Sequence, residues 1–259
     1  IAILDNFCWP DPVASEKTPD GAYKMAQLVR SCQALYDLTT LYKTPAVSGK
    51  DSCKNDSTRG GKKISIPPTL LISSVGQLAD VRKAVTMPFK AAGDCIYVVG
   101  ETKAELGASA YYRWLAEAQG SAEAYGGQVP EVNGEQALAI YRAMNQATDE
   151  GLLQSATTPT KGGLALALAL ATMGSTLGAE VDLSGVAEGA VSALFSESNS
   201  RFVISVKPDD VAAFEALFAG LPIQSIGVVS EGDSLRINGL ATLNRETMRD
   251  QFKATLQGV

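Results

Sequence analysis

The spacing of hydrophobic positions changes several times along this 259-residue chain, and each spacing predicts a different element. Residues 1–5 form a short apolar run that is typical of a buried strand. Residues 7–21 are rich in proline and aspartate, which predicts a loop. Over residues 22–42 apolar side chains recur every three or four positions, and Asp20 precedes them as a candidate N-cap. We therefore expect a long amphipathic helix after the first strand.

A polar segment, residues 47–58, then interrupts the apolar pattern. It combines a glycine with lysines, acids and hydroxyls, and it follows a short predicted strand at 45–48. We interpret it as a turn that positions polar groups against a charged ligand. Residues 59–63 are expected to be a loop tip. Residues 64–75 predict a strand interrupted by two consecutive prolines, which suit a sheet edge or a bulge.

The pattern breaks again near residues 83–93, and we place a domain boundary there, between 1–88 and 89–259. Helices and strands follow without the regular alternation of a doubly wound parallel sheet. We therefore expect an α+β (mixed α/β) architecture, with helices packed on a mixed β-sheet. The predicted strands are 95–99, 201–206, 223–230 and 234–238, and the predicted helices are 103–119, 133–150, 162–176, 209–219 and 243–257.

Composition excludes several function classes. The net charge is -6 and no run of basic residues occurs, which argues against a nucleic-acid surface. No apolar stretch is long enough to span a membrane. The four cysteines lack the close pairing of zinc or redox motifs, so we expect free thiols in a reducing cytoplasm. The chain has no histidine, which rules out Ser-His-Asp and Cys-His catalysis.

Three segments carry candidate ligand chemistry, and each has a simpler alternative. Asp5 either presents a carboxylate at a strand end or opens an Asx turn. Residues 49–52 either approach a phosphate or form a polar hairpin turn, since the upstream glycine of a P-loop is missing. Residues 157–163 place hydroxyls, a lysine and glycines at a predicted helix start. That start either binds an anion or is simply capped by Thr160.

Two further segments have simpler interpretations. Residues 196–201 contain serines, a glutamate and an arginine before a predicted strand, and we interpret them as a surface turn. Tyr111, Tyr112 and Trp114 have helical spacing and are expected in a core or an interface.

Six short motifs, taken in order, resemble the C-terminal part of the phosphoribosylformylglycinamidine synthase family. Each motif alone is weak, whereas the ordered series covers almost the whole chain. The motifs are LDNFCWP at 4–10, SGKDS at 48–52, IPPTL at 66–70, GD at 93–94, KGGLA at 161–165 and LFSES at 194–198.

The resemblance implies an AIR-synthetase-like fold, with a partial N-terminal-type domain at 1–88 and a complete C-terminal-type domain at 89–259. It also implies an ATP- and Mg²⁺-dependent ligase that uses ammonia from glutamine to convert formylglycinamide ribonucleotide to the amidine. The implied partners are an N-terminal synthetase half and a glutaminase domain or subunit, and a homodimer is compatible with the family. The family's catalytic histidine belongs to the first half, in agreement with the absence of histidine here.

The resemblance also assigns individual residues. Asp5 and Gly49 correspond to nucleotide contacts, Ser52 to a substrate contact, and Thr160 and Lys161 to the nucleotide-binding start of a helix. Lysines or threonines stand where the family has the magnesium ligand of the glycine motif and the carboxylates of the helix start. We therefore expect no metal ligand and no catalytic residue in this chain.

Two functional hypotheses follow. In the first, the chain contributes nucleotide or substrate groups to the composite site of a purine-biosynthetic ligase. In the second, it is a non-catalytic structural half with a degenerate nucleotide pocket. A kinase-like member of the same superfamily is a distant third, since it needs an aspartate-rich metal motif that is not found here.

Overall fold

The computed structural model describes residues 1–121 and 126–254, and the chain divides into two compact units. Unit 1 is Ile1–Ala79 and unit 2 is Asp80–Val259. This division falls after Ala79, whereas the sequence predicted a domain boundary at 88/89. The predicted boundary concerns the family's domains and stays a prediction. No helix in the described ranges is both long and apolar enough to cross a membrane.

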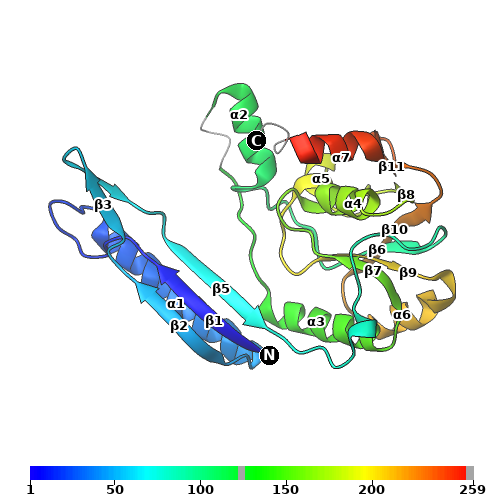
Figure 1. Ribbon diagram of the computed structural model, residues 1–259, viewed down its shortest axis with the longest axis horizontal. Helices are drawn as coiled ribbons and strands as arrows, with labels where there is room; N and C mark the ends of the chain where they lie inside the picture. The colour runs from blue at the N-terminus through cyan, green and yellow to red at the C-terminus, as the bar shows by residue number, and fades with distance from the viewer. Residues whose placement is uncertain (122–125, 255–259) are drawn as a thin grey trace. The chain divides into compact units, whose positions relative to one another are not determined.

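Unit 1 is built on a three-stranded sheet in which β1 (Ala2–Cys8) is central (Figure 1). β1 runs parallel to β2 (Ala46–Ser52) and antiparallel to β5 (Thr69–Val75). Helix α1 (Gly21–Tyr42) joins β1 to β2, because two parallel neighbours need a crossover connection. A separate hairpin consists of β3 (Asp56–Arg59) and β4 (Lys62–Ser65).

The polar segment at 47–58 is largely strand, and its interpretation as a turn is wrong. β2 occupies its first half and β3 begins in its second. β2 forms one edge of the sheet and is almost fully exposed, so its polar side chains need no burial. The expected tip at 59–63 and the interruption at the prolines are confirmed, since β4 ends at Ser65 and β5 begins at Thr69 on the other edge.

The first strand and first helix differ from expectation in detail. β1 continues to Cys8, past the predicted start of the loop, and Phe7 is buried. Asp20 stands at the N-cap of α1 without capping it. Its carboxylate instead lies 3.0 Å from Lys24 Nζ, one turn into the helix.

Unit 2 contains a seven-stranded mixed sheet in the order β12-β11-β8-β10-β6-β9-β7. Only the pair of β11 and β8 is parallel among these neighbours. The strands are β6 (Cys95–Val99), β7 (Leu153–Thr157), β8 (Gly178–Val181), β9 (Phe202–Val206), β10 (Ile223–Ser230), β11 (Ser234–Ile237) and β12 (Ala241–Asn244).

Helices lie on both faces of this sheet (Figure 1). α4, α5 and α7 lie on one side, and α3 and α6 on the other. Their bounds are α2 (Ala110–Gln119), α3 (Gly134–Asp149), α4 (Gly163–Met173), α5 (Ala190–Phe195), α6 (Val211–Leu217) and α7 (Arg245–Lys253), with short 3₁₀ turns η1 (Val81–Lys83) and η3 (Pro208–Asp210).

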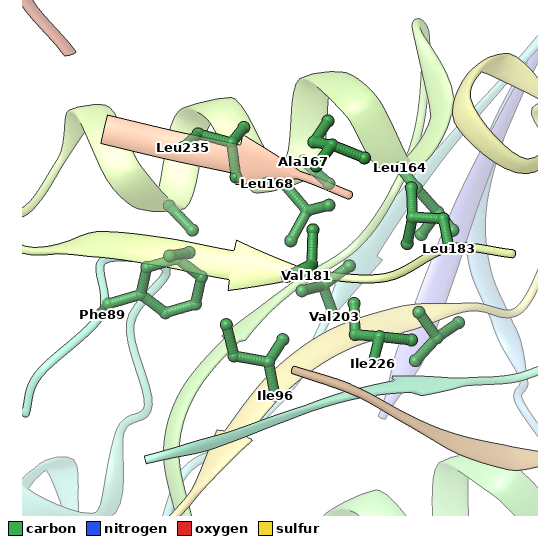
Figure 2. Packing of buried hydrophobic residues seen from close by; sticks show 14 of the residues in the cluster. Phe89, Ile96, Leu164, Ala167, Leu168, Val181, Leu183, Val203, Ile226 and Leu235 are labelled. Atoms are coloured by element: carbon green, nitrogen blue, oxygen red, sulfur yellow. The ribbon is translucent and has the colours of Figure 1, made fainter. Parts of the chain in front are cut away.

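The central strand β6 explains why two cores form. Its apolar run is continuous because both faces are covered: Ile96 and Val98 belong to one core, and Tyr97 and Val99 to the other. In the first core, Leu164 and Leu168 of α4 point at the sheet residues (Figure 2). The second core packs α3 and α6 on the opposite face. The expected mixed sheet packed with helices is confirmed.

Several elements of unit 2 were mispredicted. α2 starts at Ala110 rather than at residue 103, because Ser109 Oγ accepts the Tyr112 amide at 3.2 Å and caps the helix there. β7, β8, β12 and α5 were not predicted, since they are only four to six residues long and lack a sustained period. α7 falls within the helix expected at 243–257, whose last residues lie outside the described range.

Candidate functional site

In unit 1, Asp5 and Gly49 lie side by side on neighbouring strands. They are register partners of the parallel β1–β2 pair. A Cβ added to Gly49 would lie 2.6 Å from Asp5 Oδ1, so the carboxylate lies directly over the glycine. The absence of a side chain at position 49 therefore makes room for the Asp5 carboxylate. The structure brings these two predicted site residues together.

Ser52 belongs to the other face of the same strand. Side chains alternate along a strand, so Lys50 and Ser52 share one face while Gly49 shares its face with Asp5. Lys50 Nζ donates a hydrogen bond to Ser52 Oγ. This bond ties the lysine to the hydroxyl and away from the Asp5 carboxylate. Three residues expected to form one wall of a site thus occupy two faces of a thin, exposed sheet.

In unit 2, Thr160 and Lys161 precede helix α4 and are both exposed. The N-cap of α4 is Gly162, with φ +82°, so the alternative in which Thr160 caps the helix is wrong. Gly163 has φ +62°, and a Cβ there would lie 2.6 Å from the Ser196 carbonyl oxygen. This close approach lets the start of α4 pack against residues 196–201, the loop between α5 and β9.

Glu197, in the α5–β9 loop, holds the starts of two helices. Its Oε1 accepts hydrogen bonds from the Gly162 amide and from the Ala110 amide of α2, both at 2.8 Å. A carboxylate is favoured there, because helix N-termini present unpaired amides and positive potential. Glu197 thus already supplies a negative charge at the place where a phosphate was expected. An external phosphate near α4 must rely on the Thr160 and Lys161 side chains rather than on the Gly162 amide.

The α5–β9 loop is not a surface turn, and that interpretation is wrong. Ser196, Ser198 and Arg201 are each at most 3% exposed. The Arg201 guanidinium donates to the Ser198 carbonyl at 2.9 Å, the Ser196 carbonyl at 2.6 Å and Thr102 Oγ1 at 2.9 Å. Polar side chains are buried here because the loop's own carbonyls accept these hydrogen bonds.

The buried environment of Arg201 disfavours its positive charge. Burial lowers the pKa of Arg201 to about 10, although the nearby carboxylates of Glu105 and Glu197 act in the opposite direction. Glu105 is itself 3% exposed, and its Oε1 accepts the Glu131 amide at 3.0 Å. Among the ion pairs of the described residues, none joins Arg201 to Glu105, although both side chains are buried.

Two pockets lie next to the segments that Glu197 and Arg201 connect. One has a volume of about 440 Å³ and is lined by Thr102, Lys103 and Gln224 among others. The other, about 450 Å³, is an apolar groove between α2 and α4 that includes Trp114 and Phe195. Tyr111 stacks on Phe195 with ring centroids 4.8 Å apart, while Trp114 is 61% exposed. Both pockets have the size of small-molecule sites.

The residues present fit a nucleotide better than they fit Mg²⁺. The described residues contain no group of three histidine, cysteine, aspartate or glutamate side chains placed to hold a metal ion. Lys50 and Lys161 carry ammonium groups, which cannot ligate a cation. Lys161 is exposed, however, and an ammonium is suited to a phosphate.

Sequence reasoning missed the roles of Glu105, Glu197 and Arg201. The sequence contained one signal for Arg201. This residue stands immediately before the apolar run of β9, and a position next to a buried strand lies at the edge of the core. Glu105 carried no such signal, because its burial depends on the α5–β9 loop nearly a hundred residues later.

Comparisons with known proteins identify the family of this chain. Residues 91–239 match the family model "AIR synthase related protein, C-terminal domain". The chain is 32% identical over 247 residues to the phosphoribosylformylglycinamidine synthase subunit PurL of Parasynechococcus marenigrum (strain WH8102). That match covers 92% of the chain but only 31% of the relative, so the chain spans about a third of its length.

Solved structures share the fold at low sequence identity. T. maritima PurL complexed with FGAR aligns over 95% of this chain and 39% of its own, with TM-score 0.66 and 16% identity. Its complex with ATP gives TM-score 0.62 over 37% of that chain. E. coli HypE, a hydrogenase maturation protein, aligns over 94% of this chain and 72% of its own, with TM-score 0.55 and 15% identity. The family match covers more than half of the chain, and the chain belongs to the AIR synthase related protein family, whose C-terminal domain it carries at residues 91–239.

Proposed function

We propose that this chain is a nucleotide-binding portion of a cytoplasmic phosphoribosylformylglycinamidine synthase. The observation that carries the proposal is the 32% identity to a PurL subunit over 92% of the chain. Because the chain spans 31% of that relative, the remaining groups of the site would come from an N-terminal synthetase half. A glutaminase domain or subunit would supply ammonia, and a homodimer remains a further prediction.

The chain's own contribution is binding and charge placement. We assign the Lys161 ammonium and the Thr160 hydroxyl to the phosphates of a nucleotide, because both are exposed at the start of α4. In unit 1, taken by itself, we assign a nucleotide contact to Asp5, held over Gly49, and a substrate contact to Ser52. When bound, ATP would supply the phosphoryl group that activates an amide oxygen. The chain's residues would orient the reactants and balance phosphate charge.

A second candidate is a non-catalytic nucleotide-binding half. It is favoured by Lys50 and Lys161, which by the family resemblance stand where relatives have a magnesium ligand and an aspartate, and by the Glu197 carboxylate at the start of α4. The two candidates differ in activity once the parent protein is complete. A partial site regains turnover when the remaining parts are added, whereas a degenerate pocket binds nucleotide, if at all, without contributing to turnover.

Calorimetric titration of the chain with ADP, with and without Mg²⁺, tests the proposal. We expect binding in both conditions, weakened about tenfold by Lys161→Met because one charged phosphate contact is lost. Lys207→Met, which removes another exposed lysine of unit 2, is the matched control and should leave affinity unchanged. Binding that strictly requires Mg²⁺ would contradict the assignment of Lys161 to the phosphates.

Activity gives a separate test. The chain alone, supplied with ATP, Mg²⁺, formylglycinamide ribonucleotide and ammonia, is expected to show no turnover, because it lacks histidine and spans a third of its relative. Adding the remaining parts of the parent protein should restore activity. Turnover by the chain alone would overturn the assignment of a partial site.

A further inference from the structure

A small cavity in unit 2 is lined by unusually many acidic groups. Its volume is about 20 Å³, which is room for one molecule of the size of water. Glu101, Lys103 and Glu105 line it from the segment after β6, and Glu131 and Gln136 from the region around the start of α3. The α5–β9 loop closes it with Ser198–Ser200 side chains. None of the residues proposed above to bind nucleotide belongs to this lining.

Glu105 is the group in this cavity that needs explanation. Its side chain is almost completely buried, at 3% exposure, and Oε1 is satisfied by the Glu131 amide. Among the residues that the structure describes, none donates a hydrogen bond to Oε2. A buried carboxylate oxygen without a donor costs free energy, so a partner from outside the chain would stabilise it. The orphan oxygen therefore points to a ligand.

Neighbouring cations do not fill that role. Within the described part of the chain, Arg201 donates its hydrogen bonds to Ser198, Ser196 and Thr102 rather than to Glu105. The Lys103 ammonium lies 3.7 Å from Glu101 Oε2 at the half-exposed rim. Three carboxylates line the cavity against this single lysine. The Arg201 charge, which acts on Glu105 without a hydrogen bond, offsets a second carboxylate. The local charge stays negative and favours a cation over a neutral water molecule.

The geometry also limits which cation fits. No group of three acidic, histidine or cysteine side chains in the described residues is arranged to hold a metal ion. Mg²⁺ needs near-ideal octahedral oxygen ligands, and Ca²⁺ needs six or more. A monovalent ion close in size to water is less demanding in the geometry and charge of its ligands. It can use one carboxylate oxygen together with neutral oxygens, such as those of Gln136 and Ser200.

We propose that this cavity binds one monovalent cation of the size of potassium or ammonium, with Glu105 Oε2 as its anionic contact. The ion would connect the segment after β6, the start of α3 and the α5–β9 loop. It would thereby stabilise unit 2. The site is separate from the nucleotide contacts, so the proposal goes beyond the proposed function and does not depend on it.

Thermal unfolding of the full chain in different chloride salts at one fixed ionic strength tests this site. Potassium and ammonium should raise the midpoint above that in choline chloride by about 3–6 °C when the ion is near ten times its Kd. Titration of ammonium into a choline background should give a saturable shift, as expected for one site. Equal midpoints in all salts would mean that water alone occupies the cavity and would overturn the proposal.

Two substitutions separate the site from general salt effects. Glu105→Gln keeps an acceptor for the Glu131 amide but removes the charge, and it should abolish the difference between potassium and choline. Glu117→Gln is the matched control, since Glu117 is an exposed glutamate paired with Arg113 on α2, and it should keep the full difference. A Glu105→Gln chain that still discriminates potassium from choline contradicts the proposal.

If Glu105→Gln fails to fold, Glu101→Gln replaces it as the test variant. Glu101 lies at the rim and is half exposed, so its loss should weaken the saturable shift without unfolding unit 2. The titration of the unchanged chain remains decisive in either case, because it needs no substitution.

Discussion

The segment at 47–58 and the α5–β9 loop at 196–201 have similar compositions and opposite environments. Both combine serine, acidic and basic residues. The first provides β2, an edge strand with almost every side chain exposed, whose Lys50 bonds to Ser52 two residues away. The second buries Ser196, Ser198 and Arg201, and its Glu197 and Arg201 bond to segments from distant parts of unit 2.

The difference shows that composition predicts polarity but not burial. On an exposed edge a polar side chain exchanges water for a neighbour at little net gain. In a buried loop the same groups must be fully paired, because each unpaired group costs about 1–3 kcal/mol. Substitutions in the two segments should therefore differ by several kcal/mol in their effect on the free energy of unfolding.

The largest expected effect is that of Arg201→Met. It leaves two loop carbonyls and Thr102 Oγ1 without their donor and should cost about 3–5 kcal/mol of unfolding free energy in urea denaturation. Arg236→Met is the control. It breaks the exposed Arg236–Glu180 ion pair at 2.8 Å and should cost less than about 1 kcal/mol. Equal costs would mean that burial of Arg201 contributes nothing.

Next in size is Glu197→Ala, which leaves the Ala110 and Gly162 amides without their shared acceptor. We expect a loss of roughly 2–4 kcal/mol, measured by urea denaturation. Glu197→Gln retains an oxygen acceptor and should cost only about 1 kcal/mol, through loss of charge at two helix starts. If both substitutions cost the same, the charge rather than the hydrogen bonds stabilises the loop.

A pair of glycine substitutions compares the two regions directly. Gly163→Ala places a Cβ 2.6 Å from the Ser196 carbonyl at φ +62°, so it should cost roughly 1–3 kcal/mol. Gly49→Ala meets a contact of the same length, but with the Asp5 carboxylate, which can rotate away. We expect it to cost less than about 1 kcal/mol in the same denaturation experiment. A larger cost at Gly49 would show that Asp5 is held rigidly.

The smallest effect concerns Asp56, the one nearly buried acid of the 47–58 segment. Burial raises its pKa, but hydrogen bonds from Ser65, the Asp11 amide and Lys63 outweigh burial and hold the pKa below the usual 3.8. The stabilisation from Asp56 is therefore complete above pH 3.8 and is lost as the pH falls further. Asp56→Asn should flatten the acid limb of the stability profile, whereas Lys50→Met should leave it unchanged.

The sequence predicted the parts of the fold that depend on local pattern. β6 and α4 follow from apolar runs long enough to identify, and the hairpin tip and the proline interruption follow from turn chemistry. β8 and β12 were missed because four residues contain too little periodicity. These strands exist because β10 and β11 offer them hydrogen-bonding edges.

The candidate site was predictable only as a set of neighbours along the chain. The pairing of Asp5 with Gly49 requires the β1–β2 register, which no single segment encodes. The opposite orientation of Ser52 follows from the same register, once the 47–58 segment is known to be a strand. The partners of Glu197 and Arg201 include Gly162 and Thr102, which lie 35 and 99 positions away.

The single Glu197 oxygen shared by Ala110 and Gly162 also couples two distant segments mechanically. A displacement of the Glu197 side chain would remove the acceptor of the Ala110 and Gly162 amides together, and so would affect the starts of α2 and α4 at once. α2 carries Trp114, whose indole is largely exposed beside Tyr111. Such a displacement should therefore change the fluorescence of Trp114, measured in a Trp9→Phe background because Trp9 is the other tryptophan of the chain.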